Sequence, residues 1–111
     1  MDKLDLYRKH IQELLQEMAG FRGLPAEVKK ELVIDAVNDH YLLINVGWRE
    51  NTRYYGNVVH LDILDDKVWL QEDNTDFRVA EKLIEKGIAK EDIVLGFQAP
   101  YKRPYTGFAV A

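Results

Sequence analysis

Four segments rich in β-branched and aromatic residues follow one another between residues 32 and 72, with only short turn signals between them. The segments are residues 32–37, 40–48, 54–64 and 67–72, and the turns fall at residues 38–39, 50–52 and 65–66. Strands with such short connections pair with their sequence neighbours and run antiparallel. The sequence therefore predicts a four-stranded antiparallel meander.

An amphipathic helix is predicted ahead of the meander. Residues 4–18 place apolar side chains at helical spacing, with Asp2 positioned to cap the first turn and Gly20 positioned to end the helix. A surface helix buries such a stripe, so we expect it to pack on the sheet rather than to carry a function. Residues 20–25, with two glycines and a proline, are expected to connect this helix to the first strand.

A second helix, a fifth strand and an apolar C-terminus are predicted after the meander. Asn74 or Thr75 is expected to cap the helix, and Gly87 ends it with Ile88 beyond, as in a Schellman cap. Residues 93–97 predict the strand, and the apolar residues 108–111 predict a tail anchored in the fold. This order predicts an α+β fold in one domain, residues 1–111.

A two-residue loop at Asp65-Asp66 would set the register of the last hairpin. It places two apolar pairs on one face, Ile63 with Val68 and Leu61 with Leu70. It places two further pairs on the second face, Asp62 with Trp69 and His60 with Gln71. We expect that second face also to carry Tyr41, Leu43, Tyr54 and Val58, which makes it more aromatic than exposure favours. Either the C-terminal tail or a partner subunit is expected to cover it.

Composition excludes several classes of function. The chain has no cysteine and no serine, which removes disulfides and the two commonest hydrolytic nucleophiles. Its formal net charge of −4 disfavours autonomous DNA binding. No glycine-rich phosphate loop, long apolar span or signal-peptide pattern occurs, so we expect a cytoplasmic protein without a nucleotide cofactor or membrane segment.

His60 and Asp62 are the weak candidates for a polar site, because residues two apart in a strand share a face. Acid–base catalysis or metal binding is conceivable there. With only three histidines in the chain and His40 expected beside a turn, we expect hydrogen bonding instead, with no catalytic residue, metal or cofactor. Asp62, Asp65, Asp66 and Lys67 are the residue types that a Mg²⁺-dependent nuclease would need, but Asp65, Asp66 and Lys67 are more simply explained as a hairpin turn.

The C-terminal loop is the better candidate for a binding surface. Its exposed-looking aromatic and cationic residues are Tyr101, Lys102, Arg103 and Tyr105, and the flanking prolines limit the entropy lost on binding. Tyrosine and arginine dominate interface hot spots. The alternative is that the tyrosines only pack the tail. Tyr41, Tyr54 and Trp69 are further candidates for partner binding, and self-association is expected through the sheet edge or the aromatic face.

Four phrases of the sequence resemble the XisI family, the fdxN-element excision controlling factors of cyanobacteria. They are DHYLLINVGW at 39–48, HLDI at 60–63, KVWLQ at 67–71 and VLGFQAPYKRPYTGFAVA at 94–111. The resemblance implies an accessory factor for excision of a DNA element, acting with a nuclease-like XisH-type companion and a site-specific recombinase. The family's Gly-Phe-His-Pro-Pro phrase has Gln98 in place of histidine here, so no role of that histidine carries over.

Two other classes of function stay open. One is an interaction or immunity-like subunit that stabilises or inhibits a nuclease-like partner. The other, ranked third, is a small enzyme that uses His60 and Asp62.

Overall fold

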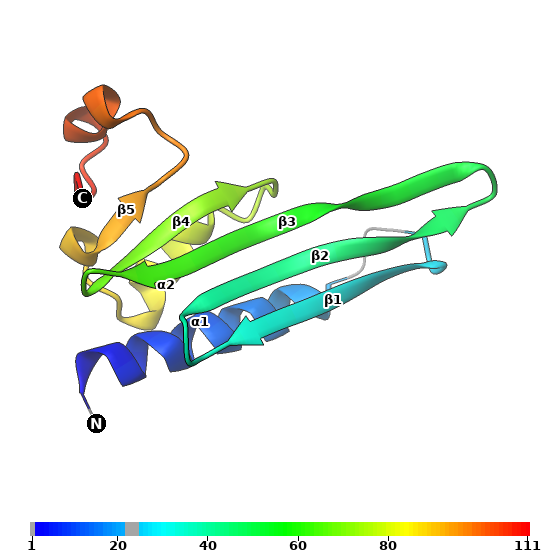
Figure 1. The fold of residues 1–111 in the computed structure, drawn as a ribbon, viewed down its shortest axis with the longest axis horizontal. Helices are drawn as coiled ribbons and strands as arrows, with labels where there is room; N and C mark the ends of the chain where they lie inside the picture. The colour runs from blue at the N-terminus through cyan, green and yellow to red at the C-terminus, as the bar shows by residue number, and fades with distance from the viewer. Residues whose placement is uncertain (1, 22–24) are drawn as a thin grey trace.

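A five-stranded sheet with two α-helices on one of its faces forms the computed structural model, which describes residues 2–21 and 25–111 (Figure 1). The helices are α1 (Lys3–Ala19) and α2 (Val79–Lys86). The strands lie in chain order: β1 (Val28–Asp35), β2 (His40–Arg49), β3 (Thr52–Leu64), β4 (Lys67–Asp73) and β5 (Ile93–Leu95). Two 3₁₀ helices follow α2, η1 (Lys90–Asp92) and η2 (Pro100–Tyr105).

The meander prediction is confirmed, because β1 to β4 pair antiparallel in sequence order, and the α+β fold class with it. The fifth strand, β5, is shorter than expected and pairs parallel with β4. The predicted connector at residues 20–25 lies partly outside the described residues. We call the face under α1 and α2 the inner face and the opposite one the outer face.

Helix α1 has the boundaries that the sequence predicts. The Asp2 side chain accepts a hydrogen bond from the Asp5 N–H, and the Gly20 N–H reaches the carbonyls of the last turn. Its apolar stripe is buried against the inner face at Tyr7, Ile11, Leu14, Leu15 and Met18. Helix α1 is therefore a packing element, as expected.

Two polar contacts fix α1 to the rest of the molecule. The Tyr7 hydroxyl donates to Asp92 Oδ2 at 2.6 Å, and burial together with this bond raises the pKa of Tyr7 to about 12. The Arg8 guanidinium donates twice to the Asp39 carboxylate, at 2.8 and 3.1 Å. Asp39 also accepts the hydroxyl of Tyr41, so the start of β2 is held directly under the helix.

The hairpin between β3 and β4 confirms the two-residue turn. Asp65 and Asp66 both have positive φ, 52° and 64°, as a tight hairpin turn requires. Three predicted pairs are present, Ile63 with Val68, Leu61 with Leu70 and Asp62 with Trp69. The fourth is wrong. A bulge at Gln71 places Glu72 opposite His60.

The predicted position of Tyr41, Leu43, Tyr54 and Val58 on the outer face is wrong. A regular ladder counted back from the β2–β3 turn puts Tyr41 opposite His60 and Leu43 opposite Val58. In the structure β3 has a bulge at Val58, so Leu43 pairs with Val59 and Tyr41 with Leu61. A one-residue shift moves every following side chain to the other face. Tyr41 and Leu43 are fully buried on the inner face, and Tyr54 pairs with Gly47 on that same side.

Helix α2 begins later than predicted. Neither Asn74 nor Thr75 caps it, because the N-cap residue is Arg78 in a left-handed conformation. The Asp73 carboxylate accepts from the Thr75 N–H and the Val79 N–H, and so holds residues 74–78 as a loop before the helix starts. The C-terminus agrees with prediction, since Gly87 has φ 113° and the Ile88 N–H bonds the Leu83 carbonyl.

The C-terminal tail is anchored, as the apolar ending predicts. Ala109 forms a parallel bridge with Val94, and its N–H donates to the Ile93 carbonyl at 2.8 Å. Phe108 packs against the core, with the Lys90 ammonium 5.0 Å from its ring centroid. The tail thus shields the β5 edge of the sheet, whereas β1 at the other edge pairs with β2 alone among the described residues.

Candidate functional site

Two groups of residues that are far apart in the sequence meet on the outer face. One is a polar cluster on β2, β3 and β4, made of His40, His60, Asp62 and Gln71. The other is η2 and its flanking residues. They meet at Trp69, which is paired with Asp62 in the sheet and lies beneath Arg103. The sequence candidates at His60 and in the C-terminal loop therefore form one continuous surface.

Asp62 is the centre of the polar cluster. Its Oδ1 lies 2.8 Å from His40 Nδ1 and 2.9 Å from His60 Nε2, and its Oδ2 accepts from Gln71 Nε2 at 3.2 Å. The sheet imposes this arrangement, because His40 is directly opposite Asp62 across the β2–β3 ladder. His60 precedes Asp62 by two residues and so points to the same face.

The cluster shifts the pKa of two of its members. The hydrogen bond to Asp62 raises the pKa of His40 above its ordinary value. Burial raises the pKa of Asp62, but the hydrogen bonds from His40, His60 and Gln71 and the electrostatic effect of His60 together outweigh it, so the pKa of that carboxyl is lowered. The carboxylate therefore remains charged over a wide pH range, and His40 holds its proton to higher pH than a free imidazole.

Arg103 fastens η2 to the sheet. Its guanidinium carbon lies 5.1 Å from the centroid of the Trp69 ring, within the range of a cation–π contact. Its Nε–H donates to the Gln98 carbonyl at 3.1 Å, and an Nη2–H donates to the Gly96 carbonyl at 3.4 Å. Of the four predicted loop residues, Arg103 is therefore the one that fixes the loop to the sheet.

The remaining predicted loop residues face solvent. Tyr101 is 73% exposed and Tyr105 is 89% exposed, and Lys102 between them is exposed as well. The Lys102 ammonium lies 5.8 Å from the Tyr101 ring centroid. The alternative that these tyrosines only pack the tail is wrong for both rings. A short 3₁₀ helix held by Arg103 presents them to the outside.

A family model described as XisI protein matches residues 1–110. The chain belongs to the XisI family. A XisI-like protein from Anabaena variabilis ATCC 29413 shares 44% sequence identity with this chain, and its crystal structure superposes with a TM-score of 0.92. The match covers 98% of this chain and 100% of the other protein's chain. A second crystal structure, of the fdxN element excision controlling factor XisI from the same organism, has 37% sequence identity to this chain and a TM-score of 0.85. This match covers 99% of this chain and 100% of the other protein's chain. No curated protein matches.

The structure of this XisI family member places two predicted residues away from the outer face and brings one more residue to it. Tyr41 and Tyr54 belong to the inner side and contribute nothing to the outer surface. His40 begins β2 next to the turn, as predicted, but it also joins the cluster, which was not expected. The β2–β3 register is the signal that identifies His40, and the bulge at Val58 is what hides that register in the sequence.

Sequence reasoning also missed an aromatic group at the tip of the β2–β3 hairpin, which extends together with β1 well beyond β4 and β5 in Figure 1. The Arg53 guanidinium lies 5.4 Å from the Trp48 ring centroid and 5.2 Å from that of Tyr55. All three belong to the outer face, and both rings are exposed. We call Trp48, Arg53 and Tyr55 the hairpin-tip group.

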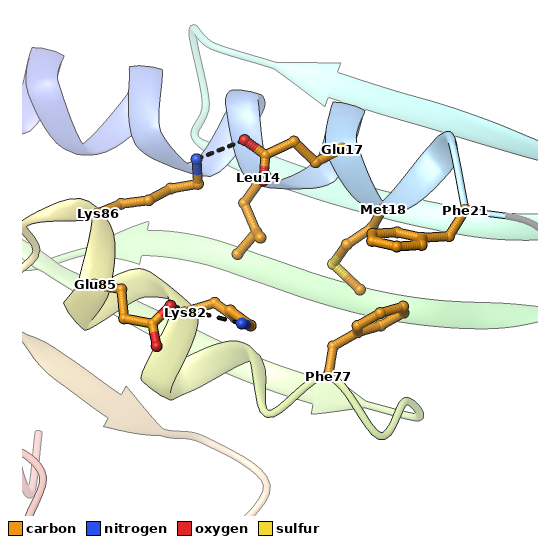
Figure 2. Close-up of a pocket in the computed structure, with 8 residues that line it drawn as sticks. All are labelled: Leu14, Glu17, Met18, Phe21, Phe77, Lys82, Glu85 and Lys86. Atoms are coloured by element: carbon orange, nitrogen blue, oxygen red, sulfur yellow. Dashed lines mark hydrogen bonds and ion pairs between the residues drawn. The ribbon is translucent and has the colours of Figure 1, made fainter.

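A groove of about 370 Å³ lies on the helix side, between α1 and α2 (Figure 2). Leu14, Met18 and Phe77 line it with apolar surface, and Phe21 stacks near Phe77 with ring centroids 4.7 Å apart. The charges at its rim are paired, Lys86 with Glu17 at 2.8 Å and Lys82 with Glu85 at 3.6 Å. The groove is an interhelical packing gap, and among the residues that line it we find no nucleophile–base arrangement.

None of the helices in the described parts of the chain is long and apolar enough to cross a membrane.

Proposed function

We infer that this chain is an accessory controlling factor for excision of a DNA element, which acts by binding protein partners rather than by catalysis. Membership of the XisI family and the 37% identity to an fdxN element excision controlling factor support the excision role. The observation that carries the binding mode is the pair of exposed tyrosines on the fastened helix η2. The partners we propose are a nuclease-like XisH-type companion and, with it, a recombinase.

The physical case for binding through η2 is the low cost of ordering it. Arg103 already fixes the loop through two hydrogen bonds and the contact with Trp69, so association immobilises little further backbone. Tyr101 and Tyr105 offer large, rigid, amphipathic side chains of the type that anchors interfaces. Lys102 adds a positive charge that suits an acidic patch on the companion.

A calorimetric titration of the companion tests the proposal. Tyr101→Ala combined with Tyr105→Ala should leave the thermal unfolding of the chain unchanged, because both rings are exposed. It should weaken binding by about 2 kcal/mol, roughly thirtyfold in Kd. The matched control is Trp48→Ala combined with Tyr55→Ala, which removes the other exposed aromatic pair. Equal binding by the η2 variant and the wild type would contradict binding through η2. Weakened binding by the control variant alone would place the interface at the hairpin tip.

The alternative of an immunity-like subunit predicts a different readout from the same complex. A controlling factor leaves the intrinsic DNA cleavage of a nuclease-like companion intact or redirects it, whereas an immunity-like subunit suppresses it. Comparing cleavage by the companion alone and with a stoichiometric amount of this chain separates the two. We also expect no submicromolar duplex binding by the chain alone at physiological salt, because its net charge is −4.

We expect self-association as part of this function. The outer face carries exposed Val33, Trp48 and Tyr55, and β1 leaves one edge of the sheet open among the described residues. Light scattering over a concentration series should show a mass above that of the monomer at tens of micromolar. A strictly monomeric mass throughout that series would contradict this expectation.

A further inference from the structure

The cluster at Asp62 has the composition and spacing of a metal site, although sequence spacing alone assigns it to hydrogen bonding. Its donor atoms are two imidazole nitrogens and one carboxylate oxygen, all within 4.8 Å of one another. They come from neighbouring strands in a fixed register, His40 on β2 with His60 and Asp62 on β3. Sites built on strands position their ligand side chains more precisely than sites on loops.

The distances are close to those of ligands around one ion. Zinc binds histidine nitrogen and carboxylate oxygen at about 2.0–2.2 Å, which places neighbouring donor atoms of a tetrahedral site roughly 3.3 to 3.5 Å apart. The two His–Asp62 distances are 2.8 and 2.9 Å. Both imidazoles approach the same oxygen, Oδ1. An ion therefore needs each His–Asp62 pair to open by about half an ångström. It also needs the two imidazole nitrogens, which lie within 4.8 Å of each other, to adjust to the same spacing, and it replaces the protons between the ligands.

Gln71 orients the Asp62 carboxylate so that its Oδ1 could bind an ion. Gln71 donates to Oδ2 and thereby directs Oδ1 toward the histidines, the arrangement in which a second layer of residues positions a metal ligand. The Asp62 side chain is 16% exposed and that of His40 is 54% exposed, so the cluster opens to solvent on the His40 side. A water molecule can complete the coordination from that side.

We propose that His40, His60 and Asp62 bind one first-row divalent transition-metal ion, with Zn²⁺ the ion that this donor set fits best. Imidazole nitrogen suits zinc and its neighbours in the series, whereas Mg²⁺ and Ca²⁺ require sites built from oxygen. This inference is independent of partner binding by η2. It gives the outer face a metal-binding cluster beside the proposed docking surface.

Calorimetry with ZnCl₂ and the d–d absorption of bound Co²⁺, both on untagged full-length chain, test the proposal. One ion should bind per chain, and a hundredfold excess of Mg²⁺ should not displace it. His60→Gln and Asp62→Asn should each lower the affinity by more than about a hundredfold, and Gln71→Ala by about tenfold. Saturating Zn²⁺ should raise the unfolding temperature of the wild type by several degrees.

The third histidine provides the control. His10 lies on α1, outside the cluster, so His10→Gln should bind Zn²⁺ as the wild type does. His40→Gln changes an exposed side chain and keeps the test valid if His60→Gln fails to fold. Absence of binding by the wild type would overturn the proposal. So would wild-type affinity in both His40→Gln and His60→Gln, or loss of binding confined to His10→Gln.

Discussion

Helices α1 and α2 cover the inner face of the sheet, whereas on the outer face, among the described residues, the Arg103 side chain of η2 lies over Trp69. Every inner-face side chain at the centre of these strands is apolar and buried, as at Leu43, Leu61 and Leu70. The outer face instead carries the His40–His60–Asp62 cluster, the exposed tyrosines of η2 and the hairpin-tip group. One sheet therefore has a face that stabilises the fold and a face that is free to bind.

We therefore expect the residues that stabilise the fold and the residues that bind to alternate along each strand. Adjacent residues of one strand point to opposite faces of the sheet. Leu43 is therefore fully buried on the inner face, whereas Leu42 is half-buried on the outer face. Substitutions at inner positions should reduce the free energy of unfolding. Substitutions at outer positions should alter binding with little effect on stability.

The largest expected effect tests the inner face directly. Leu43→Ala removes a fully buried side chain and should lower the free energy of unfolding by about 2–5 kcal/mol. Leu42→Ala, one residue earlier and half-buried on the outer face, should cost less than about 1.5 kcal/mol. Urea unfolding of both variants decides the matter. Equal losses would mean that the two faces are not distinct in packing.

Removing the tail should have the next largest effect. Deleting residues 108–111 uncovers Val94, which is fully buried, and takes Phe108 away from the core. We expect a loss of about 1.5–3 kcal/mol in the free energy of unfolding, the value for exposing one such side chain. Deleting Ala111 alone is the control and should be neutral. An unchanged unfolding curve for the deletion of residues 108–111 would show that the tail does not stabilise the β5 edge of the sheet.

A smaller effect is expected at the fastening of η2. Arg103→Ala loses two hydrogen bonds to carbonyls and the contact with Trp69, which together should cost about 1–2 kcal/mol. Lys102→Ala, the exposed neighbour, should cost less than about 0.5 kcal/mol. Thermal unfolding measures both. A nearly equal loss of unfolding free energy in the two variants would mean that Arg103, like Lys102, does not stabilise the fold.

The fold could be predicted well from the sequence where one local signal was enough. Asp2 and Gly20 bound α1 correctly, Asp65-Asp66 gave the turn, and Gly87 gave the end of α2. The start of α2 could not be predicted in this way. Asp73, several residues upstream, holds the loop and leaves the true N-cap at Arg78, a residue with no capping side chain.

The candidate site was predicted in part. The outer-face positions of His60, Asp62 and Trp69 agree with the sequence prediction, because each stands in a recognisable strand, and the loop tyrosines are exposed. Their role in binding stays a prediction. His40 was missed and Tyr41 and Tyr54 were misplaced for a single reason, the extra residue in β3 at Val58. A bulge leaves the hydrophobic pattern on both sides intact and only changes their relative phase, so periodicity carries no sign of it.

The smallest predicted effect concerns pH and the cluster on the outer face. The pKa of His40 is raised on folding, so its contribution is fully present below about 6.5 and is lost as pH rises through the folded value. The pKa of Asp62 is lowered, so its contribution is present above about 4 and is lost as pH falls through the folded value. The pair therefore stabilises most between about pH 4 and 6.5.

Urea unfolding of His40→Gln and wild type at several pH values tests this window. The difference between the two proteins should be largest near pH 5 and should shrink toward pH 9, and chelator should be present to remove any bound metal. His10→Gln measures the effect of losing a histidine outside the cluster. A difference that grows with pH would contradict the assigned shifts.

The most direct test of the central claim, that the outer face binds and the inner face stabilises, is mapping the companion onto the chain by nuclear magnetic resonance. Titrating the companion into isotopically labelled chain should perturb the amides of η2, with Tyr101 and Tyr105 foremost, and those of outer-face neighbours such as Trp69. Helices α1 and α2 should stay unperturbed. Perturbations centred on the groove between α1 and α2, with η2 unaffected, would contradict the account.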